Sequence, residues 1–236
     1  MNPEDTWLTR LSVITGIIKY RVRYFCKTYM GLSCPLMGNG MCFSRDVISR
    51  YGWNAYSLTE NWEYYANLVL DGYVPTYAEK ALIYSHMVVK LAHGETQRKR
   101  WITGRIQTSS KYVPRLLAEF MKRKKAIPLD AAVEFLLPSL SMLFNWSILS
   151  LILALVLHSA GLVLSKSLIA VQAGVVAVQV LFFAAGLLMS RAPLQTWISL
   201  PLIPIILIWR LLVTAKAVLG IRRKAGWEKT KRITKL

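Results

Sequence analysis

Acidic residues are scarce in this chain of 236 residues. Asp and Glu together number 12 against 30 Lys and Arg, so the formal net charge is +18 at pH 7. Charge of either sign almost disappears between residues 134 and 218, where only five side chains carry one: Glu134, Lys166, Arg191, Arg210 and Lys216. A single water-soluble domain spreads its charges along the whole chain. The uneven division therefore indicates one part in water and another in a membrane.

Cysteine is also scarce, which argues against two kinds of site. Cys26, Cys34 and Cys42 are the only cysteines, and they form no CxxC pair. Neither a disulfide framework nor a zinc site is predicted, and free cysteines fit a reducing cytosol. The first ten residues lack the charged-then-apolar pattern of an export signal, so we expect membrane insertion to use later segments.

The basic residues gather beside the apolar segments, at Lys122–Lys125 and in the tail from Arg222 to Lys235. The positive-inside rule and the attraction of anionic lipid headgroups both predict this placement. These clusters are not interleaved with the aromatic side chains of a nucleic-acid-binding face. The lipid bilayer is therefore an expected partner, and nucleic acid is not.

Residues 1–128 have the pattern of a mixed α/β structure in water. Apolar residues recur at near-helical period from Trp7 to Tyr29, which predicts an amphipathic helix. Further helices are predicted from Ser44 or Asp46, over 61–70 with a stop at Asp71-Gly72, over 95–110, and over 114–125. Short strands are predicted at 41–43, 74–77 and 81–84.

Two apolar segments, about 135–158 and 168–189, are long enough to cross a membrane as helices. At ~1.5 Å per residue, each covers a hydrocarbon core of ~30 Å. The residues between them carry a single lysine, as expected of a short loop outside the cytosol. These segments predict a helical hairpin through the bilayer.

A third apolar segment, about 194–219, is less suited to a full crossing. Pro201 and Pro204 interrupt its backbone hydrogen bonding, and Arg210 would lie near mid-membrane. A full crossing would also place the basic tail on the side opposite Lys122–Lys125, against the positive-inside rule. We expect a re-entrant or interfacial segment, with the soluble part and both termini in the cytosol.

Three short motifs follow one another ahead of the apolar segments. They are Gly38-Asn39-Gly40-Met41-Cys42-Phe43, Thr59-Glu60-Asn61, and Gln97-Arg98-Lys99-Arg100-Trp101, which fits QxxRW. Their order and spacing resemble membrane-bound family-2 glycosyltransferases of the cellulose-synthase and hyaluronan-synthase type. The stretch from Gly226 to Arg232 also resembles the W-x-x-T-x-R ending of bacterial members. The resemblance covers nearly the whole chain, which looks like the C-terminal half of such an enzyme.

The resemblance implies an α/β fold, a partial GT-A domain, followed by an α-helical transmembrane region. The expected domains are a glycosyltransferase part at 1–115, a basic interfacial linker at 116–133, a membrane region at 134–219 and a basic cytosolic tail at 220–236. The implied activity is sugar transfer from a nucleotide-sugar, expected to be a uridine diphosphate sugar, to a polysaccharide or lipid-linked acceptor. The expected location is the cytosolic face of the plasma (inner) membrane.

The same resemblance implies roles for the motif residues. Arg100 would supply positive charge near the diphosphate, Trp101 a flat platform for a sugar ring, and Gln97 a hydrogen bond to the acceptor. The turn formed by Gly38, Asn39 and Gly40 would allow the backbone to approach the acceptor closely. Alternatively, Arg100 and Trp101 are an interfacial anchor, and the glycines form a plain turn.

The base position departs from the family pattern. Inverting transfer needs a carboxylate to deprotonate the acceptor hydroxyl, and the family has Asp where this chain has Asn61 after Thr59 and Glu60. An amide cannot accept that proton, so Glu60 or Glu63 would have to substitute. Glu60 could equally be an acid favoured at a helix N-terminus.

The sequence also lacks a DxD motif, the family's metal-binding signature. The full family enzyme is expected to use Mg²⁺ or Mn²⁺, whose ligands would lie outside this chain. A separately encoded N-terminal glycosyltransferase half is therefore one expected partner. Two alternatives stay open: a non-catalytic relative that pairs with a synthase or is a relic, and a small lipid- or anion-binding membrane protein.

Overall fold

A computed structural model describes residues 6–83, 91–162, 166–190, 192 and 194–220. Arg191 and the basic tail with its Gly226–Arg232 motif lie outside the described residues. Every regular element in the described part is a helix. In chain order these are α1 (Trp7–Gly16), η1 (Ile17–Tyr24), α2 (Phe25–Tyr29), α3 (Arg45–Tyr51), α4 (Glu60–Leu70), α5 (Leu91–Arg123), α6 (Ala126–Leu136), α7 (Leu140–Ser159), α8 (Lys166–Met189), α9 (Leu194–Ile198), η2 (Leu200–Leu202) and α10 (Ile203–Leu219).

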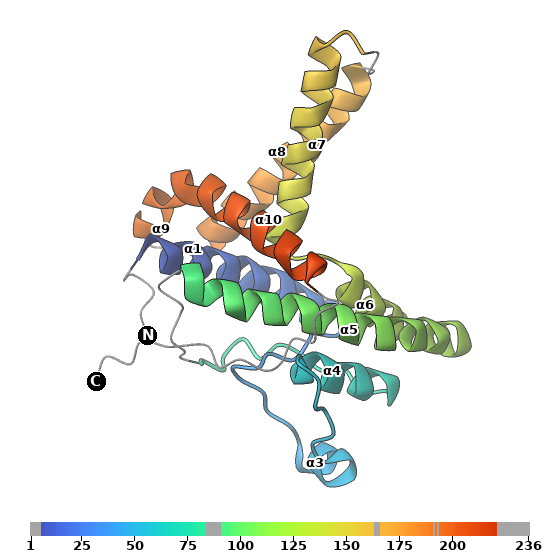
Figure 1. Cartoon of the computed structure of the whole chain (residues 1–236). Helices are drawn as coiled ribbons and strands as arrows, with labels where there is room; N and C mark the ends of the chain where they lie inside the picture. The colour runs from blue at the N-terminus through green and yellow to red at the C-terminus, as the bar shows by residue number, and fades with distance from the viewer. Residues whose placement is uncertain (1–5, 84–90, 163–165, 191, 193, 221–236) are drawn as a thin grey trace.

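The helices are stacked in layers beneath a two-helix hairpin (Figure 1). α7 and α8 form the hairpin, which projects away from the rest of the molecule. α10 crosses the base of the hairpin, and α1 and α5 lie beneath α10. α4 and α3 lie farthest from the hairpin. The candidate motifs are therefore on the side of the molecule away from the hairpin tip.

The amphipathic helix predicted over Trp7–Tyr29 is confirmed, but its middle is a π-helix. α1, η1 and α2 follow one another without a break, and Leu8, Leu11 and Ile18 are among the buried residues. The side chain of Ile18 fills the space beside Gly186 of α8, where a Cβ would collide with it. π-Helices are rare and are often found at functional sites.

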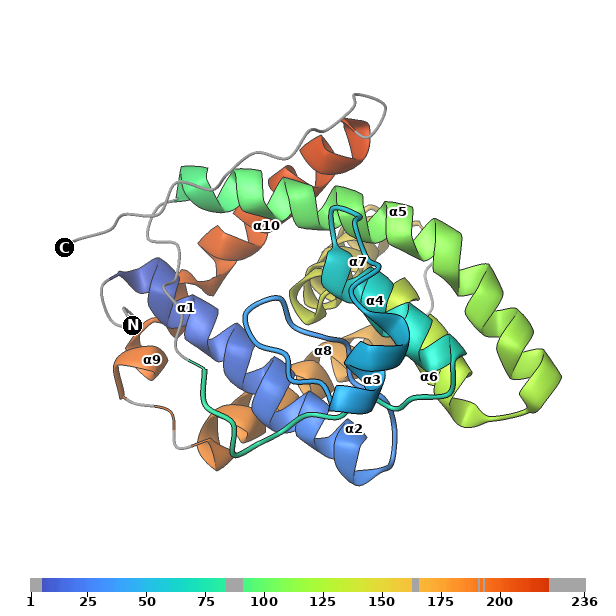
Figure 2. The ribbon, with the colours of Figure 1, turned by 90° about the horizontal axis from the view of Figure 1, so that it is seen from below.

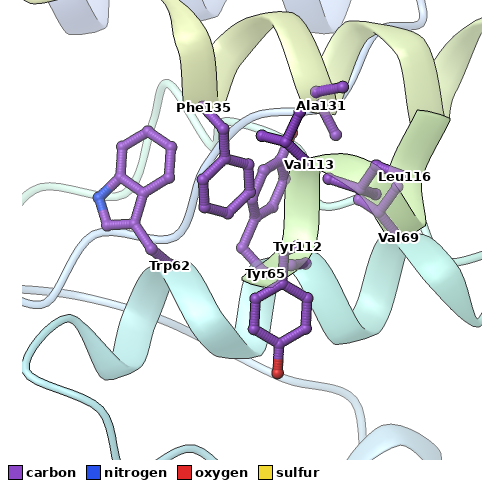
Figure 3. Close-up of a cluster of buried hydrophobic side chains, with 10 residues drawn as sticks. Trp62, Tyr65, Val69, Tyr112, Val113, Leu116, Ala131 and Phe135 are labelled. Carbon is purple, nitrogen blue, oxygen red and sulfur yellow. The ribbon is translucent and has the colours of Figure 1, made fainter. Parts of the chain in front are cut away.

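An aromatic core joins α4, α5 and α6 (Figure 3). Trp62 and Phe135 meet edge to face with ring centroids 5.0 Å apart, and Tyr65 is fully buried beside them. Leu116 and Ala131, both at 0% exposure, belong to this core. Burial of each large apolar side chain contributes about 1.5–3 kcal/mol. Residues 116–133 thus pack within the core of the preceding segment, and the domain boundaries stay predictions.

The predicted break between helices 95–110 and 114–125 is wrong, because α5 runs unbroken from Leu91 to Arg123 with Pro114 inside it. A proline removes one backbone hydrogen bond and normally kinks or ends a helix. Here Val113 and Leu116 lie on either side of the proline and are both in the α4–α5–α6 core. Tertiary packing on both sides of Pro114 therefore holds the two halves in one helix.

The first predicted span also begins too early. α6 ends at Leu136 and α7 begins at Leu140, so the helix expected over 135–158 is interrupted around Pro138. The Nη2 of Arg105 donates to the carbonyl oxygens of Glu134 and Leu137, each at 2.5 Å. A cation bound to the last carbonyls of a helix stabilises its C-terminus. α6 consequently packs with α4 and α5 and does not continue into α7.

No strand occurs among the described residues, so the predicted α/β part is not confirmed. Residues 41–43, 74–77 and 81–83 belong to no helix or strand, and Tyr84 lies outside the described residues. One bridge joins Met37 to Gly40, and Cys34 N–H donates to the Pro75 carbonyl at 2.8 Å. An extended segment becomes a strand only where a neighbour pairs its backbone groups, and the described chain offers few such neighbours.

Three helical stretches are long and apolar enough to cross a membrane: Leu140–Ser159, Lys166–Met189 and Leu194–Leu219. Within α8 only Gly186 and Leu187 are buried, although nearly all of its side chains are apolar. Side chains of this kind are stable when exposed only if the solvent is apolar. The helices are thus consistent with membrane association.

Candidate functional site

The start of α4 is pressed against α5 at Gly104. A Cβ on Gly104 would stand 2.7 Å from Thr59 Cγ2 and 3.2 Å from the Leu58 carbonyl carbon, which is too close. The Thr59 hydroxyl lies 2.8 Å from the Thr108 hydroxyl, and Thr108 donates in turn to the Gly104 carbonyl. Thr59 is buried, so it fixes the corner between the helices and offers no free hydroxyl to a ligand.

This contact places the Trp101 end of the QxxRW motif about one helical turn from the Thr59–Glu60 corner. At 100° per residue, Gln97, Trp101, Gly104 and Thr108 fall within roughly 60° of one another on the surface of α5. Gly104 and Thr108 touch Thr59, and Trp101 precedes Gly104 by about one turn. Gln97 and Trp101 therefore lie on the α5 face that meets the start of α4. Figure 2 shows α5 running alongside α4.

Arg100 and Trp101 are only partly covered. The Trp101 side chain is 49% exposed, which leaves a ring face open to a ligand. Arg100 is half-buried, and its Nε is buried without a hydrogen-bond partner in the described chain. A buried donor without a partner is costly, so it is a candidate for a bond to something outside the chain.

The Gly38-Asn39-Gly40 turn faces the same corner. Gly40 N–H donates to the Met37 carbonyl at 2.9 Å, which closes the turn, and Gly38 and Asn39 are exposed. A Cβ on Gly38 would stand 4.0 Å from Glu60 Oε1. Gly40 has a different role, because the Ile83 side chain already fills the space beside it. The open part of the turn is Gly38 and Asn39.

Asn61 connects this turn to α4. Its Nδ2 donates to the Leu36 carbonyl at 2.6 Å, one residue before the turn begins. The amide is needed for this bond, because a carboxylate has no hydrogen to donate at neutral pH. The Asn61 side chain thus ties the start of α4 to the chain just before the turn.

Glu63 is fully engaged and cannot serve as a base. Its Oε2 accepts from the backbone N–H groups of Tyr56 and Ser57 at 3.0 and 2.9 Å, and Oε1 accepts from Lys111 and Tyr112. Burial alone would raise the pKa of Glu63, but the bonds from Lys111, Ser57 and Tyr56 lower it to about 2. A carboxylate this stable in its ionised form is a poor proton acceptor.

Glu60 is the remaining carboxylate at the corner. It is half-buried at the first position of α4 and makes neither a hydrogen bond nor an ion pair with the described residues. Of the three predicted base candidates, Glu60 alone is both unengaged and beside the turn. The structure thus brings Glu60 close to Gly38, Asn39 and the α5 helix that carries the QxxRW motif. The side chains of Thr59, Asn61 and Glu63 instead make structural contacts.

A second polar cluster lies on the other side of the α4–α6 core. Glu134 is 2% exposed and accepts from Arg23 at 2.9 Å and from Lys27 at 3.0 Å. Lys27 also pairs with Asp130 at 2.9 Å, and Asp130 accepts from both the N–H and the hydroxyl of Ser33. We call Arg23, Lys27, Asp130 and Glu134 the latch, because they tie α6 to η1 and α2.

The available carboxylates do not fit a divalent metal ion. No group of three His, Cys, Asp or Glu residues that could hold a metal occurs among the residues described. Glu63, Asp130 and Glu134 already pair with lysine or arginine. Mg²⁺ and Mn²⁺ prefer free carboxylate oxygens, so no step of the chemistry is assigned to a metal on these residues.

Gly104, Thr108 and Lys111 shape the site and were missed in the sequence analysis. An isolated glycine inside a helical pattern costs about 1 kcal/mol against alanine, and that cost indicates close packing. Gly104 carried that signal three residues after Trp101. Nothing in the sequence showed that Lys111 reaches Glu63 on another helix, because that pair depends on how α4 and α5 cross.

In a comparison with protein-family models, residues 2–214 match the family described as "Glycosyl transferase family group 2". Searches of curated proteins and of solved structures returned no match. The family match covers most of the chain and includes all the motif residues around the α4–α5 corner. The chain therefore belongs to glycosyl transferase family group 2.

Proposed function

We propose that this chain forms the acceptor side of a membrane-bound glycosyltransferase of the QxxRW type, similar to cellulose and hyaluronan synthases. It would help to move a sugar from a nucleotide-sugar to a polysaccharide or lipid-linked acceptor. The observation that carries the proposal is the close contact of α5 at Gly104 with Thr59. That contact puts the half-exposed Trp101 on the same corner as Glu60 and the Gly38 turn.

In this proposal each exposed group has one task. Trp101 stacks on the acceptor sugar, and Arg100 directs its unpartnered Nε to the diphosphate that leaves the donor. Glu60 takes the proton of the attacking hydroxyl, and Gln97 holds the acceptor. The exposed backbone at Gly38 and Asn39 borders the acceptor opposite the indole. Inverting displacement requires this pairing of a base with a cation on the leaving group.

The proposed membrane arrangement has the α7–α8 hairpin crossing the bilayer and α10 lying along its inner surface. α10 lies across the base of the hairpin (Figure 1). Arg210 of α10 donates to Thr15 of α1 at 3.3 Å, and Lys216 pairs with Glu95 of the basic helix α5 at 3.3 Å. Charged contacts with α1 and α5 favour a position at the interface over a buried span.

The proposal is tested by sugar transfer with the purified chain in lipid nanodiscs, using a panel of radiolabelled nucleotide-sugars. Because the sequence has no DxD, we expect transfer only when a glycosyltransferase front half is supplied. Trp101→Ala should lower the rate by roughly 10- to 100-fold through loss of acceptor positioning. Trp146→Ala is the matched control, because Trp146 on α7 is 51% exposed. Equal rates for the two variants would refute the assigned role of Trp101.

A second candidate function is a non-catalytic subunit that pairs with a synthase, and Asn61 favours it. The bond from Asn61 to the Leu36 carbonyl supports a structural role for the residue at the expected base position. Glu60→Gln distinguishes the two functions, because it should abolish transfer only if this chain supplies the base, and Asn61→Asp tests where that base lies. If the chain is catalytic through Glu60, the Asn61→Asp variant should be less stable and no faster. A rise in turnover would show that the catalytic base belongs at position 61, and it would overturn the assignment of that role to Glu60.

A further inference from the structure

Four cations lie in and around the latch, but only two carboxylates face them. Lys19, Arg23, Lys27 and Arg105 gather about Asp130 and Glu134 in the described chain. Arg23 pairs with Glu134, and Lys27 pairs with both Asp130 and Glu134. Arg105 donates to the carbonyl oxygens at the end of α6 and lies 4.5 Å from the Trp62 ring. Lys19 is left without an anionic partner.

The contacts of Lys19, which is half-buried, are weak for an ammonium group. Its Nζ lies 3.5 Å from Met37 Sδ and 5.3 and 5.5 Å from the ring centroids of Tyr20 and Tyr24. It makes no ion pair with the described residues. A thioether and two ring faces solvate an ammonium much less well than water or a carboxylate does. An ion pair with a bound anion would therefore stabilise this ammonium group strongly.

The position of Lys19 connects it to the candidate site. Met37 is the first residue of the turn that continues through Gly38 and Asn39, and Gly38 faces Glu60. Lys19 is presented by the π-helix η1, an irregularity often found at functional sites. The amine thus lies against the edge of the turn, with Tyr20 and Tyr24 beneath it.

We infer that Lys19 binds an oxyanion of the substrate, a phosphate or a carboxylate, at the edge of the Met37–Gly40 turn. The inference rests on the proposed function, and it adds a second cation to Arg100. The two oxyanion sources are the diphosphate of the donor and an acidic group on the acceptor. Either would supply the negative charge that the cluster around Lys19 lacks.

The surroundings of Lys19 agree with this role. Burial, together with the charges of Arg105 and Arg23 and against the opposing effect of Glu134, lowers the pKa of Lys19 to about 8. The groups that face it are Tyr20 and Tyr24 from its own helix, Arg105 from α5 and Glu134 from α6. A bound oxyanion would raise the pKa of Lys19 again and protect the amine from acylation.

The test is titration calorimetry of the full chain in phosphatidylcholine nanodiscs, with inorganic pyrophosphate and glucuronate as probes. Lys19→Gln should weaken binding of one probe on the order of tenfold, as expected for loss of one charge-assisted hydrogen bond. Lys19→Arg should retain most of the affinity, and Lys122→Gln, at the far end of α5, should match the unaltered chain. The probe that responds identifies the source of the oxyanion.

If Lys19→Gln does not fold, acetylation of the unaltered chain at pH 8 replaces it. Mass spectrometry should then show Lys19 labelled faster than the other lysines and protected by one of the probes. Unchanged affinity in Lys19→Gln, labelling without protection, or no binding of either probe would overturn the inference. Loss of pyrophosphate binding in Arg100→Gln, with unchanged affinity for both probes in Lys19→Gln, would overturn it while leaving the proposed function intact.

Discussion

The latch and the candidate site differ in how their charged groups are partnered. In the latch, Glu134 and Asp130 each meet a cation within 3.0 Å, and the Glu134 side chain is 3% exposed. At the site, Glu60 has no partner in the described chain, Arg100 has a buried Nε without one, and Trp101 is half-exposed. Paired groups hold helices together, whereas unpaired groups at a corner of the fold are available to a ligand.

The largest effect is expected at the latch. Glu134→Gln leaves the half-buried Arg23 without a carboxylate and Lys27 with Asp130 alone, which should lower the free energy of unfolding by about 3–5 kcal/mol. Thermal unfolding in detergent measures it. Glu119→Gln is the control, since Glu119 pairs with Arg123 along the surface of α5 and should cost less than ~0.5 kcal/mol. Equal losses in the two variants would show that the latch does not stabilise α6.

The second-largest effect on the free energy of unfolding is expected at Glu63. Its carboxylate is fully partnered, as in the latch, although it lies beside the candidate site. Its pKa falls from 4.5 to about 2 on folding, so its stabilisation is present above pH 4.5. As the pH falls from 4.5 toward 2, that contribution, roughly 3 kcal/mol, should be lost. Unfolding measured between pH 2 and pH 6 should show a weaker pH dependence in Glu63→Gln. An unchanged slope would contradict this account.

A smaller loss of stability with a large loss of function is expected at Gly104. Gly104→Ala forces the new Cβ against Thr59 and the Leu58 backbone, which should cost about 1–3 kcal/mol and separate the motif helix from Glu60. Gly174→Ala is the control, because nothing lies within 4 Å of a Cβ there. That control should be neutral or slightly stabilising in a helix. Sugar transfer and thermal unfolding together separate the two effects.

Local signals in the sequence predicted the helix ends well. Ser44 caps α3 through a bond from Val47 N–H, and α4 ends at Leu70 with Asp71 as its cap, as predicted. Both depend on residues close in sequence, which is why they could be read directly. Pro114 misled the prediction because the packing of α5 against α4 and α6 outweighs its local effect. The strands at 41–43 and 74–77 depend on neighbours that the pattern could not supply.

The site was predicted in part for the same reason. The motifs identified Glu60, Gly38, Arg100 and Trp101, and the structure brings their segments to one corner. The engagement of Glu63 by Lys111 and of Asn61 by the Leu36 carbonyl depends on tertiary contacts. No spacing in the sequence encodes those contacts, so it could not show which carboxylate stays free.

Disulfide formation between positions 59 and 108 tests most directly whether the motif helix meets the Thr59–Glu60 corner. The two hydroxyl oxygens lie 2.8 Å apart, so Thr59→Cys with Thr108→Cys should oxidise to a crosslinked chain, seen by mass spectrometry, in a background without Cys26 and Cys42. Thr59→Cys with Ser110→Cys, on an exposed face of α5, should stay reduced. Crosslinking through position 110 and not 108 would show that Gln97 and Trp101 lie on a face of α5 that points away from Glu60. That result would contradict the proposed site.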